Sequence, residues 1–329
     1  MSFSGILLAT GWLIRDTFRQ ALASRVFWLM LGVSVLCIVF CSSAHIVGGR
    51  PLRTAEDIEL YGGDDKPLTG PNPKPGQLTL AFGAVRLGLF RDGAAEVHFL
   101  LVLLAKWVAG AAGTLIALVW TAGFLPEFLQ PSAAAVLLAK PVPRSVLLFG
   151  KYLGVLVFVT VQATVFVVGT WLALGLCTGI WQHGYLLSLP LLVLHFAIVY
   201  SISLLIAVCT RNTVACAFGS IMFWFICFAM NYGRHAAVAR PRLAPGLAPF
   251  PPLFRNMIEA GYWLLPKPAD LVILLDRALQ ADAHFFVQPE FAAVQAMHAF
   301  HPALSVLTSA LFAAAVLAIA ARELATTDY

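Results

Sequence analysis

Long uninterrupted runs of apolar residues constrain this chain more than any other feature of its sequence. An α-helix needs about 20 such residues to cross the hydrocarbon core of a bilayer. Six runs near or above that length lie at residues 26–47, 99–123, 152–177, 186–208, 214–232 and 303–321. Only 11% of the residues are charged, against about 25% in soluble domains. The sequence therefore predicts an all-α membrane protein with six transmembrane helices in residues 26–329.

Two long segments between these runs are polar and rich in Pro and Gly, at residues 48–97 and 233–301. Such composition is typical of loops outside the membrane. The second loop also holds two short apolar stretches, one at about residues 258–265 and one after Pro268. Pro268 and Asp270 suit the first turn of a helix. Both stretches are too short to span, so we expect helices that lie on the membrane or dip partly into it.

Residues 1–25 are predicted to form an amphipathic helix along the membrane surface. Phe18 falls on an apolar face with a four-residue repeat, and Arg15 and Arg19 fall on a neighbouring face. Arg25 follows directly before the first span. Apolar and cationic faces side by side are typical of interfacial helices.

An even number of spans places both termini on one side of the membrane. With the N-terminus inside, the short inner segments hold eight Lys and Arg against four Asp and Glu, whereas the two long loops hold twelve of each. Cations in short loops and helix flanks weigh most in setting orientation. We therefore predict an N-in, C-in, multi-pass protein of the cell (inner) membrane, with loops 48–97 and 233–301 extracytoplasmic.

The sequence carries no pattern typical of catalysis. It lacks the phosphate-binding motif GxxxxGK[ST], as well as HExxH and GxSxG. The six cysteines lie in or beside apolar runs without a CxxC, which excludes a recognisable zinc or disulfide framework. His298 and His301, with His284 and Glu290 nearby, fit a polar helix face better than a metal site, because a firm third ligand is missing. The scattered charge of +5 gives no case for nucleic acid.

Two ionisable residues interrupt the apolar runs and are candidates for function inside the membrane. Lys106 either lies within the second helix or marks its outer boundary, with the span beginning at Trp107. We prefer the boundary, because a cation at mid-bilayer costs about 2.5–3.5 kcal/mol on the insertion scale. We expect His195 to be a packed histidine that forms a hydrogen bond between helices rather than a ligand.

Residues 124–151, between the second and third spans, form the most distinctive polar segment. Glu127 closes the second apolar run, and prolines bound the short stretch SAAAVLLAK, because proline blocks helix continuation and fixes φ. Lys140 ends this stretch, Arg144 and Lys151 follow it, and these three cations suit lipid phosphates or the acids of a partner protein. The alternative is a solvated loop whose cations only follow the positive-inside rule.

This segment resembles the coupling region of permease subunits of type-two ATP-binding-cassette (ABC) exporters. The likeness is to the branch linked to nitrous-oxide reductase maturation and multidrug efflux. Its specific part is Glu127, then LLAKPVPR at residues 137–144, then Gly150 and Lys151. TFRQAL at residues 17–22 is similar to the family's N-terminal elbow helix, WLLP at 263–266 to its Leu-Pro element, and AREL at 321–324 to its C-terminal ending. A glycine common after the acid is replaced by Pro131-Ser132.

The resemblance implies a permease that is not itself an enzyme, dimerises with itself or a homologue, and is driven by a cytosolic ABC ATPase. ATP-Mg would then lie on the partner, and this chain would bind no cofactor or metal. A coupling helix at residues 132–140 would dock on the ATPase. The implied coupling residues are Glu127, Ser132, Lys140, Pro141, Arg144 and Lys151. Two other classes stay open: a membrane scaffold or assembly factor that binds partners through its extracytoplasmic loops, and a secondary transporter.

Overall fold

Six long helices make up most of the computed structural model, which describes residues 3–47, 77–88, 93–129, 143–246, 250–281 and 288–326. All six are long and apolar enough to cross a membrane. They are Arg25–Ser42 (α2), Gly93–Phe128 (α4, η2, α5 and α6), Arg144–Thr178 (α8), His183–Thr210 (η3 and α9), Thr213–Leu243 (α10) and Pro302–Thr326 (α14). Each contains most or all of one predicted apolar run, so the prediction of a helical, six-span membrane protein is confirmed at the level of helix length and composition.

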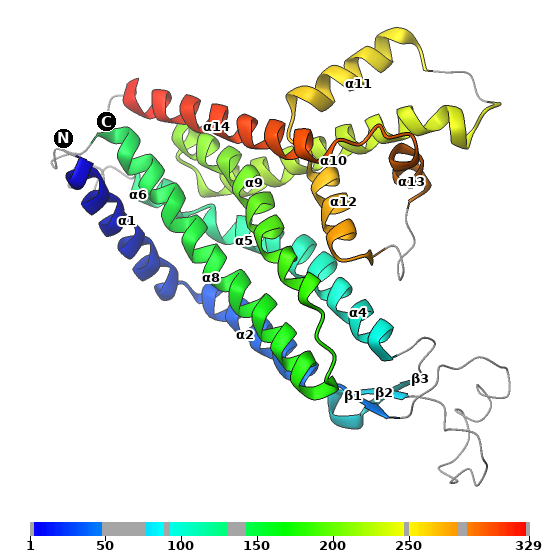
Figure 1. Cartoon of the computed structure of the whole chain (residues 1–329). Helices are drawn as coiled ribbons and strands as arrows, with labels where there is room; N and C mark the ends of the chain where they lie inside the picture. The colour runs from blue at the N-terminus through cyan, green and yellow to red at the C-terminus, as the bar shows by residue number, and fades with distance from the viewer. Residues whose placement is uncertain are drawn as a thin grey trace, which may run out of the picture.

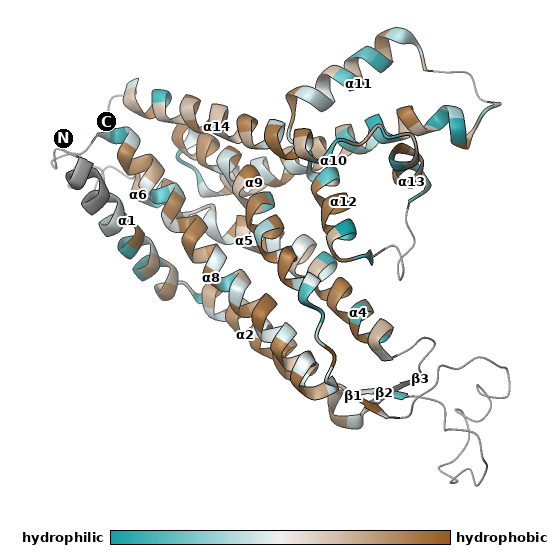
Figure 2. Ribbon diagram, in the orientation of Figure 1, coloured by the Kyte–Doolittle hydropathy of each residue, from teal (hydrophilic) through white to brown (hydrophobic). Residues whose placement is uncertain are grey.

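Large apolar side chains remain exposed along the outer faces of these helices. Leu36 on α2 is 68% exposed, Phe218 on α10 is 72% exposed and Leu311 on α14 is 59% exposed. Figure 2 shows the apolar colour continuing over most of the length of the long helices. A water-soluble protein seldom leaves so much apolar surface uncovered, so these faces are the ones that contact lipid.

The centre of the bundle is formed by α8 and α9. Tyr152 of α8 stacks on Tyr200 of α9 with ring centroids 5.8 Å apart, and its hydroxyl donates a hydrogen bond to the Ala197 carbonyl. Phe158 packs edge-on against Trp120 of α5 (Thr114–Thr121) at 4.9 Å. These aromatic contacts hold the second, third and fourth spans together.

The N-terminal helix α1 (Phe3–Ala23) lies against the first turns of α8, and α2 continues along the remainder of α8 (Figure 1). Two glycines of α8 allow this close approach. A Cβ at Gly150 would lie 2.4 Å from Leu13, and one at Gly154 would lie 2.7 Å from the Thr17 hydroxyl. Small residues four apart let two helix backbones come together. The placement of α1 at the membrane surface stays a prediction.

The second spanning helix begins at Gly93 and includes Lys106. The position of the membrane boundary along this helix, preferred from the sequence at Trp107, stays a prediction. The helix runs from α4 (Gly93–Leu103) through the π-helical segment η2 (Leu104–Gly113) to α5. At 1.5 Å per residue its 36 residues extend about 54 Å, well beyond the ~30 Å of a hydrocarbon core. The helix tolerates the cation because Lys106 is paired with an acid from a distant helix, as described below.

The loop between the first two spans contains a small antiparallel sheet. Strands β1 (His45–Val47), β2 (Gln77–Leu80) and β3 (Val85–Gly88) pair in that order, with His45 opposite Thr79 and Thr79 opposite Arg86. The sequence did not predict these strands. Leu78 and Leu80 are buried under the sheet with Cys41 and Val97, which ties the loop to the ends of α2 and α4.

The second long loop is mostly helical. α10 continues past its predicted end at residue 232 and ends at Leu243. Pro241 lies in its last turn, where a proline interrupts the helical hydrogen bonds. Three short helices follow: α11 (Pro252–Leu264), α12 (Pro268–Ala278) and α13 (Pro289–Ala296), each with proline in its first turn. The two short helices expected around residue 258 and after Pro268 are therefore confirmed, and α13 was not predicted. Figure 1 shows all three beside the ends of α10 and α14.

Candidate functional site

Two polar centres lie near opposite ends of α14. Ser305, near its start, belongs to one. The other includes Lys151 of α8, seven residues after Arg144, which donates to the Leu324 carbonyl near the end of α14. Ser305 and Leu324 are 19 residues apart, which is about 28 Å along a helix. The bundle therefore has a polar centre toward each of its ends.

The first centre, which we call the α1–α6–α8 junction, consists of Asp16, Gln20, Glu127 and Lys151. Lys151 is only 1% exposed, and its ammonium group donates to Asp16 Oδ2 at 3.1 Å and to Gln20 Oε1 at 3.0 Å. The Gln20 amide in turn donates to Glu127 Oε2 at 2.7 Å. These hydrogen bonds and the Asp16 charge compensate the buried ammonium group for its lost hydration.

The local sequence explains how the junction forms. Asp16 and Gln20 lie one helical turn apart on α1 and so share a face. Glu127 lies on α6 (Phe124–Phe128), at the end of the second spanning helix. Gly150 removes the side chain that would keep α1 away, so the neighbouring Lys151 reaches the α1 acceptors. Its ammonium group also lies 5.0 Å from the ring centroid of Phe128.

The predicted coupling residues divide into three groups. Glu127 and Lys151 are brought together through Gln20. Arg144 lies apart from them and donates to the carbonyls of Leu324 and Ala325 at 3.2 and 3.4 Å, near the C-terminus of α14. Ser132, Lys140 and Pro141 lie outside the described residues.

Lys151 does not face outward. The idea that its charge pairs directly with lipid phosphates or with a partner's acids is wrong for this residue, because Asp16 and Gln20 already hold it inside the protein. A part in coupling through the junction stays a prediction. The sequence missed Asp16 and Gln20 as members of this centre, although their spacing on α1 was visible.

The cationic residues predicted for the N-terminal helix are all exposed, and these are Arg15, Arg19 and Arg25. Phe18 points elsewhere and packs edge-on against Phe158 of α8, with ring centroids 5.1 Å apart. At least part of the apolar face of α1 is therefore covered by protein, while its cations remain accessible.

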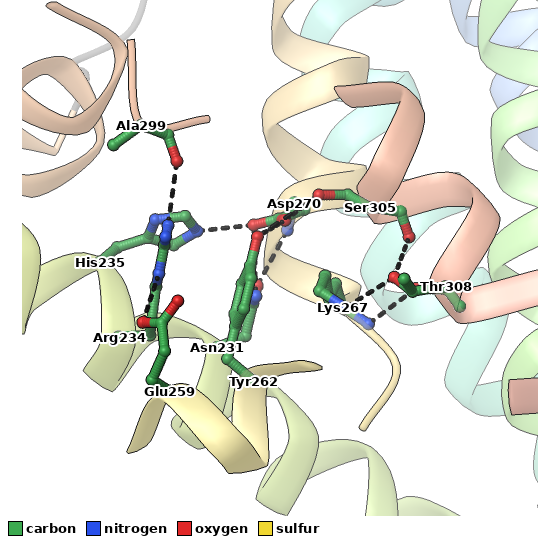
Figure 3. Close-up of polar contacts among 11 residues, drawn as sticks. Asn231, Arg234, His235, Glu259, Tyr262, Lys267, Asp270, Ala299, Ser305 and Thr308 are labelled. Carbon is green, nitrogen blue, oxygen red and sulfur yellow. Dashed lines mark hydrogen bonds and ion pairs between the residues drawn. The ribbon is translucent and has the colours of Figure 1, made fainter. Parts of the chain in front are cut away.

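The second centre, the Asp270 network, is shown in Figure 3 and consists of Asn231, His235, Tyr262, Asp270 and Ser305. The Asp270 side chain at the start of α12 is fully buried. Its Oδ1 contacts His235 Nε2 at 2.6 Å and accepts from the Asn231 amide at 3.2 Å. Its Oδ2 accepts from the hydroxyls of Tyr262 at 2.7 Å and Ser305 at 2.5 Å. One carboxylate thus joins α10, α11, α12 and α14.

Two cations flank this network on the faces of aromatic rings. Lys267 lies over the ring of Tyr262 at 4.7 Å and donates to the Thr308 hydroxyl of α14 at 2.7 Å. Arg234 lies over the same ring at 4.5 Å and donates to Glu259 Oε2 at 3.2 Å (Figure 3). Tyr262 is therefore held between a cation on each side and the carboxylate at its hydroxyl.

The charge states follow from these surroundings. Burial alone would raise the pKa of the Asp270 carboxyl group, but hydrogen bonding and charge attraction from His235, with hydrogen bonds from Ser305 and Tyr262, outweigh burial and hold that pKa below its ordinary value. Burial lowers the pKa of Lys267, and the Asp270 charge partly opposes this. Burial, followed by the Asp270 charge, raises the pKa of Tyr262. At neutral pH the network thus contains a carboxylate and a neutral phenol.

Sequence reasoning noted Asp270 only as a helix-start residue and missed the network. Its partners are 8 to 39 positions away, so no local pattern joins them. One signal was visible, since Asn231 and His235 are polar residues four apart at the end of an apolar run. Two polar side chains on one buried helix face need hydrogen-bond partners, which other parts of the fold must supply.

The two intramembrane candidates line one cavity. Lys106 Nζ pairs with Asp276 Oδ2 of α12 at 2.8 Å. His195 Nε2 accepts a hydrogen bond from the Trp224 indole at 2.9 Å, so the expectation of a packed histidine bonded between helices is confirmed. Both residues border a space of about 410 Å³ between η2, α9, α10, α12 and α13.

Within the part of the chain that the structure describes, no three His, Cys, Asp or Glu side chains gather as metal ligands would. His298 and His301 are among the residues covered, and His284 lies outside them. A scan against known protein families finds no match, and a search of curated proteins finds no similar sequence. The likeness to type-two ABC permeases therefore rests on the motif residues of this chain alone.

Proposed function

We propose that this protein is the membrane-spanning permease subunit of an ABC exporter, driven by a separate cytosolic ATPase. The six apolar helices suit a membrane transport subunit. The observation that carries the proposal further is the α1–α6–α8 junction. It ties together, through Gln20 on α1, the two helices that flank the predicted coupling segment.

The junction gives a physical route from a docked ATPase to the spans. The second spanning helix ends at Phe128 and the third begins at Arg144, so a force on residues 130–142 acts on both. Lys151, Gln20 and Glu127 pass that force to α1, and Arg144 passes it to the last turns of α14. A partner seated on this segment would thus move four helices as one unit, as rigid packed elements do.

The remaining features of the proposal rest on the orientation predicted from the sequence and on what the resemblance to ABC permeases implies. The chain would sit in the inner membrane with both termini in the cytosol, dimerise with itself or a homologue, and leave ATP-Mg to the partner subunit. Closure of the two ATPases on ATP would pull the coupling segments together and change the packing of the spans around a substrate path. No catalytic role is assigned to this chain.

A membrane scaffold is the second candidate, and one observation favours it. The Asp270 network fixes α11 and α12 to α10 and α14 with a fully buried carboxylate. That arrangement suits a rigid platform for a partner protein on the predicted extracytoplasmic side. Dependence on a cytosolic ATPase separates the two functions.

The test uses the full chain purified from its native membrane in a mild detergent. We expect an ATP-hydrolysing subunit to co-purify, and vanadate-sensitive ATP hydrolysis to fall in Lys140→Glu because a cation at the docking surface is reversed. Arg144→Glu is unsuitable, since Arg144 also holds the end of α14. Arg322→Glu, exposed on α14 near the same end, is the matched control.

Absence of any ATPase from the purified protein would refute the proposal. Equal retention and equal ATP hydrolysis in Lys140→Glu and Arg322→Glu would refute the docking role of residues 130–142. Loss of the ATPase in Lys140→Glu alone supports both.

A further inference from the structure

The cavity beside Lys106 has the size and lining of a small-molecule site. Its volume of about 410 Å³ falls within the range of roughly 300–1,000 Å³ that such sites occupy. Spanning helices form one side, and the short helices α12 and α13 form the other. The aromatic side chains on its walls are Trp107, Trp224, Phe228 and Phe291.

One ion pair interrupts these apolar walls. Lys106 and Asp276 are 22% and 28% exposed, so the pair is open to the cavity rather than sealed in the core. Lys106 lies on the π-helical segment η2. Helices of this type are rare and occur often at functional sites. The pair joins a spanning helix to α12, which also carries Asp270.

The charges of this pair restrict what the cavity can hold. A bound cation or anion would add one uncompensated charge to an apolar space, which is costly. A ligand that carries one positive and one negative charge adds no net charge. Its anionic group would meet Lys106 through a charge-assisted hydrogen bond, and its cationic group would meet Asp276 and the faces of the aromatic rings.

We propose that this cavity binds a zwitterionic amphiphile, with an apolar body and adjacent anionic and cationic groups, as in a phosphocholine head group with its chain. The exchange replaces one ion pair by two, while the apolar body covers the walls. The site goes beyond the permease function, because binding needs neither an ATPase nor transport. The ligand has two sources, a bilayer lipid or a soluble amphiphile.

Native mass spectrometry of the full chain in a maltoside detergent tests the proposal. Three lipids with the same dimyristoyl chains are titrated: a phosphocholine (zwitterionic), a phosphoglycerol (anionic) and a trimethylammonium-propane (cationic). We expect the phosphocholine to bind roughly tenfold more tightly than either charged lipid, as one additional paired charge provides. Equal binding of all three, or tightest binding of a singly charged lipid, would overturn the proposal without any variant.

Two variants then locate the site. Lys106→Met leaves the Asp276 carboxylate and should shift preference to the cationic lipid, whereas Asp276→Asn leaves the ammonium group and should shift it to the anionic lipid. A general loss of folding cannot move the two preferences in opposite directions. Arg277→Met, the matched control, removes the next cation along α12, which packs on Phe300 instead, and should keep the phosphocholine preference. The same preference in both variants contradicts the assignment to this pair.

The two sources are distinguished by competition. Hexylphosphocholine carries the same head group on a short soluble chain. If it displaces the dimyristoyl lipid at comparable concentration, the cavity selects the head group and accepts a soluble amphiphile. If it fails to do so, the long chains contribute to binding and the ligand is a lipid of the bilayer.

Discussion

The Asp270→Asn variant should lose a large part of the stability with which α11 and α12 are held to α10 and α14. Each carboxylate oxygen of Asp270 holds two side-chain contacts in a fully buried position, His235 and Asn231 on one and Tyr262 and Ser305 on the other. Asparagine replaces one carboxylate oxygen by an amide group that cannot accept, so two of these four contacts lose their acceptor. At about 1–3 kcal/mol for each unsatisfied buried group, the loss is about 2–6 kcal/mol.

The measurement is the free energy of unfolding of the purified protein in mixed micelles, followed by circular dichroism against denaturing detergent. Glu259→Gln is the control. It also changes an acid to an amide, but Glu259 is 43% exposed, and the buried Arg234 keeps its hydrogen bond to the Ala299 carbonyl and can donate to the amide oxygen. We therefore expect a loss of about 1 kcal/mol. Equal stability of the two variants would refute the assignment of Asp270 as the centre of the network.

Three further changes probe the other contacts. Gly154→Ala should cost about 1–3 kcal/mol of stability through overpacking, because the new methyl group meets Thr17; addition of Thr17→Ala should restore part of the melting temperature. Lys151→Met should change the free energy of unfolding by no more than about 1 kcal/mol, because Asp16 stays solvated and a well-packed apolar residue replaces a buried cation. Stimulation of the partner ATPase should fall in the same variant. A loss of stability as large as that of Asp270→Asn would contradict this reasoning. Burial lowers the pKa of Lys267 in the folded protein. Between that lowered value and about 10.4 the unfolded chain therefore binds more protons than the folded protein, and stability should rise with pH across this range. In Lys267→Met, melting temperatures measured against pH should not show that rise.

The six spans could be predicted because each apolar run alone exceeds or approaches the length that lipid requires. The ends of the helices could not, since hydropathy reports what lies in lipid and not where backbone hydrogen bonding stops. α8 therefore begins at Arg144 and α10 ends at Leu243, several residues beyond the predicted spans. Proline in the first turn made α12 readable from the sequence, whereas α11 was predicted from its apolar stretch at about residues 258–265 and begins earlier, at Pro252.

The polar contacts were hidden for a different reason. The cost of Lys106 was judged for a lone cation, but its partner Asp276 lies 170 positions away. Lys151 was read as a surface charge because its acceptors on α1 lie more than 130 positions before it. In each case the energy depends on a pairing that only the packed chain supplies. A polar residue inside an apolar helix predicts that such a pairing exists, but the sequence does not show which residue is its partner.

The packing of α1 on α8 also sets an order of events during synthesis. Gly154 of α8, which meets Thr17, is made 131 residues after Ala23 ends α1, which takes about 7–26 s at 5–20 residues per second. For that time the face of α1 that carries Leu13 and Thr17 has no α8 to cover it. Ribosome-bound chains that stop before α8 should therefore leave α1 open to a protease, and longer chains should protect it. α1 thus waits for contacts that a helix translated more than 100 residues later supplies.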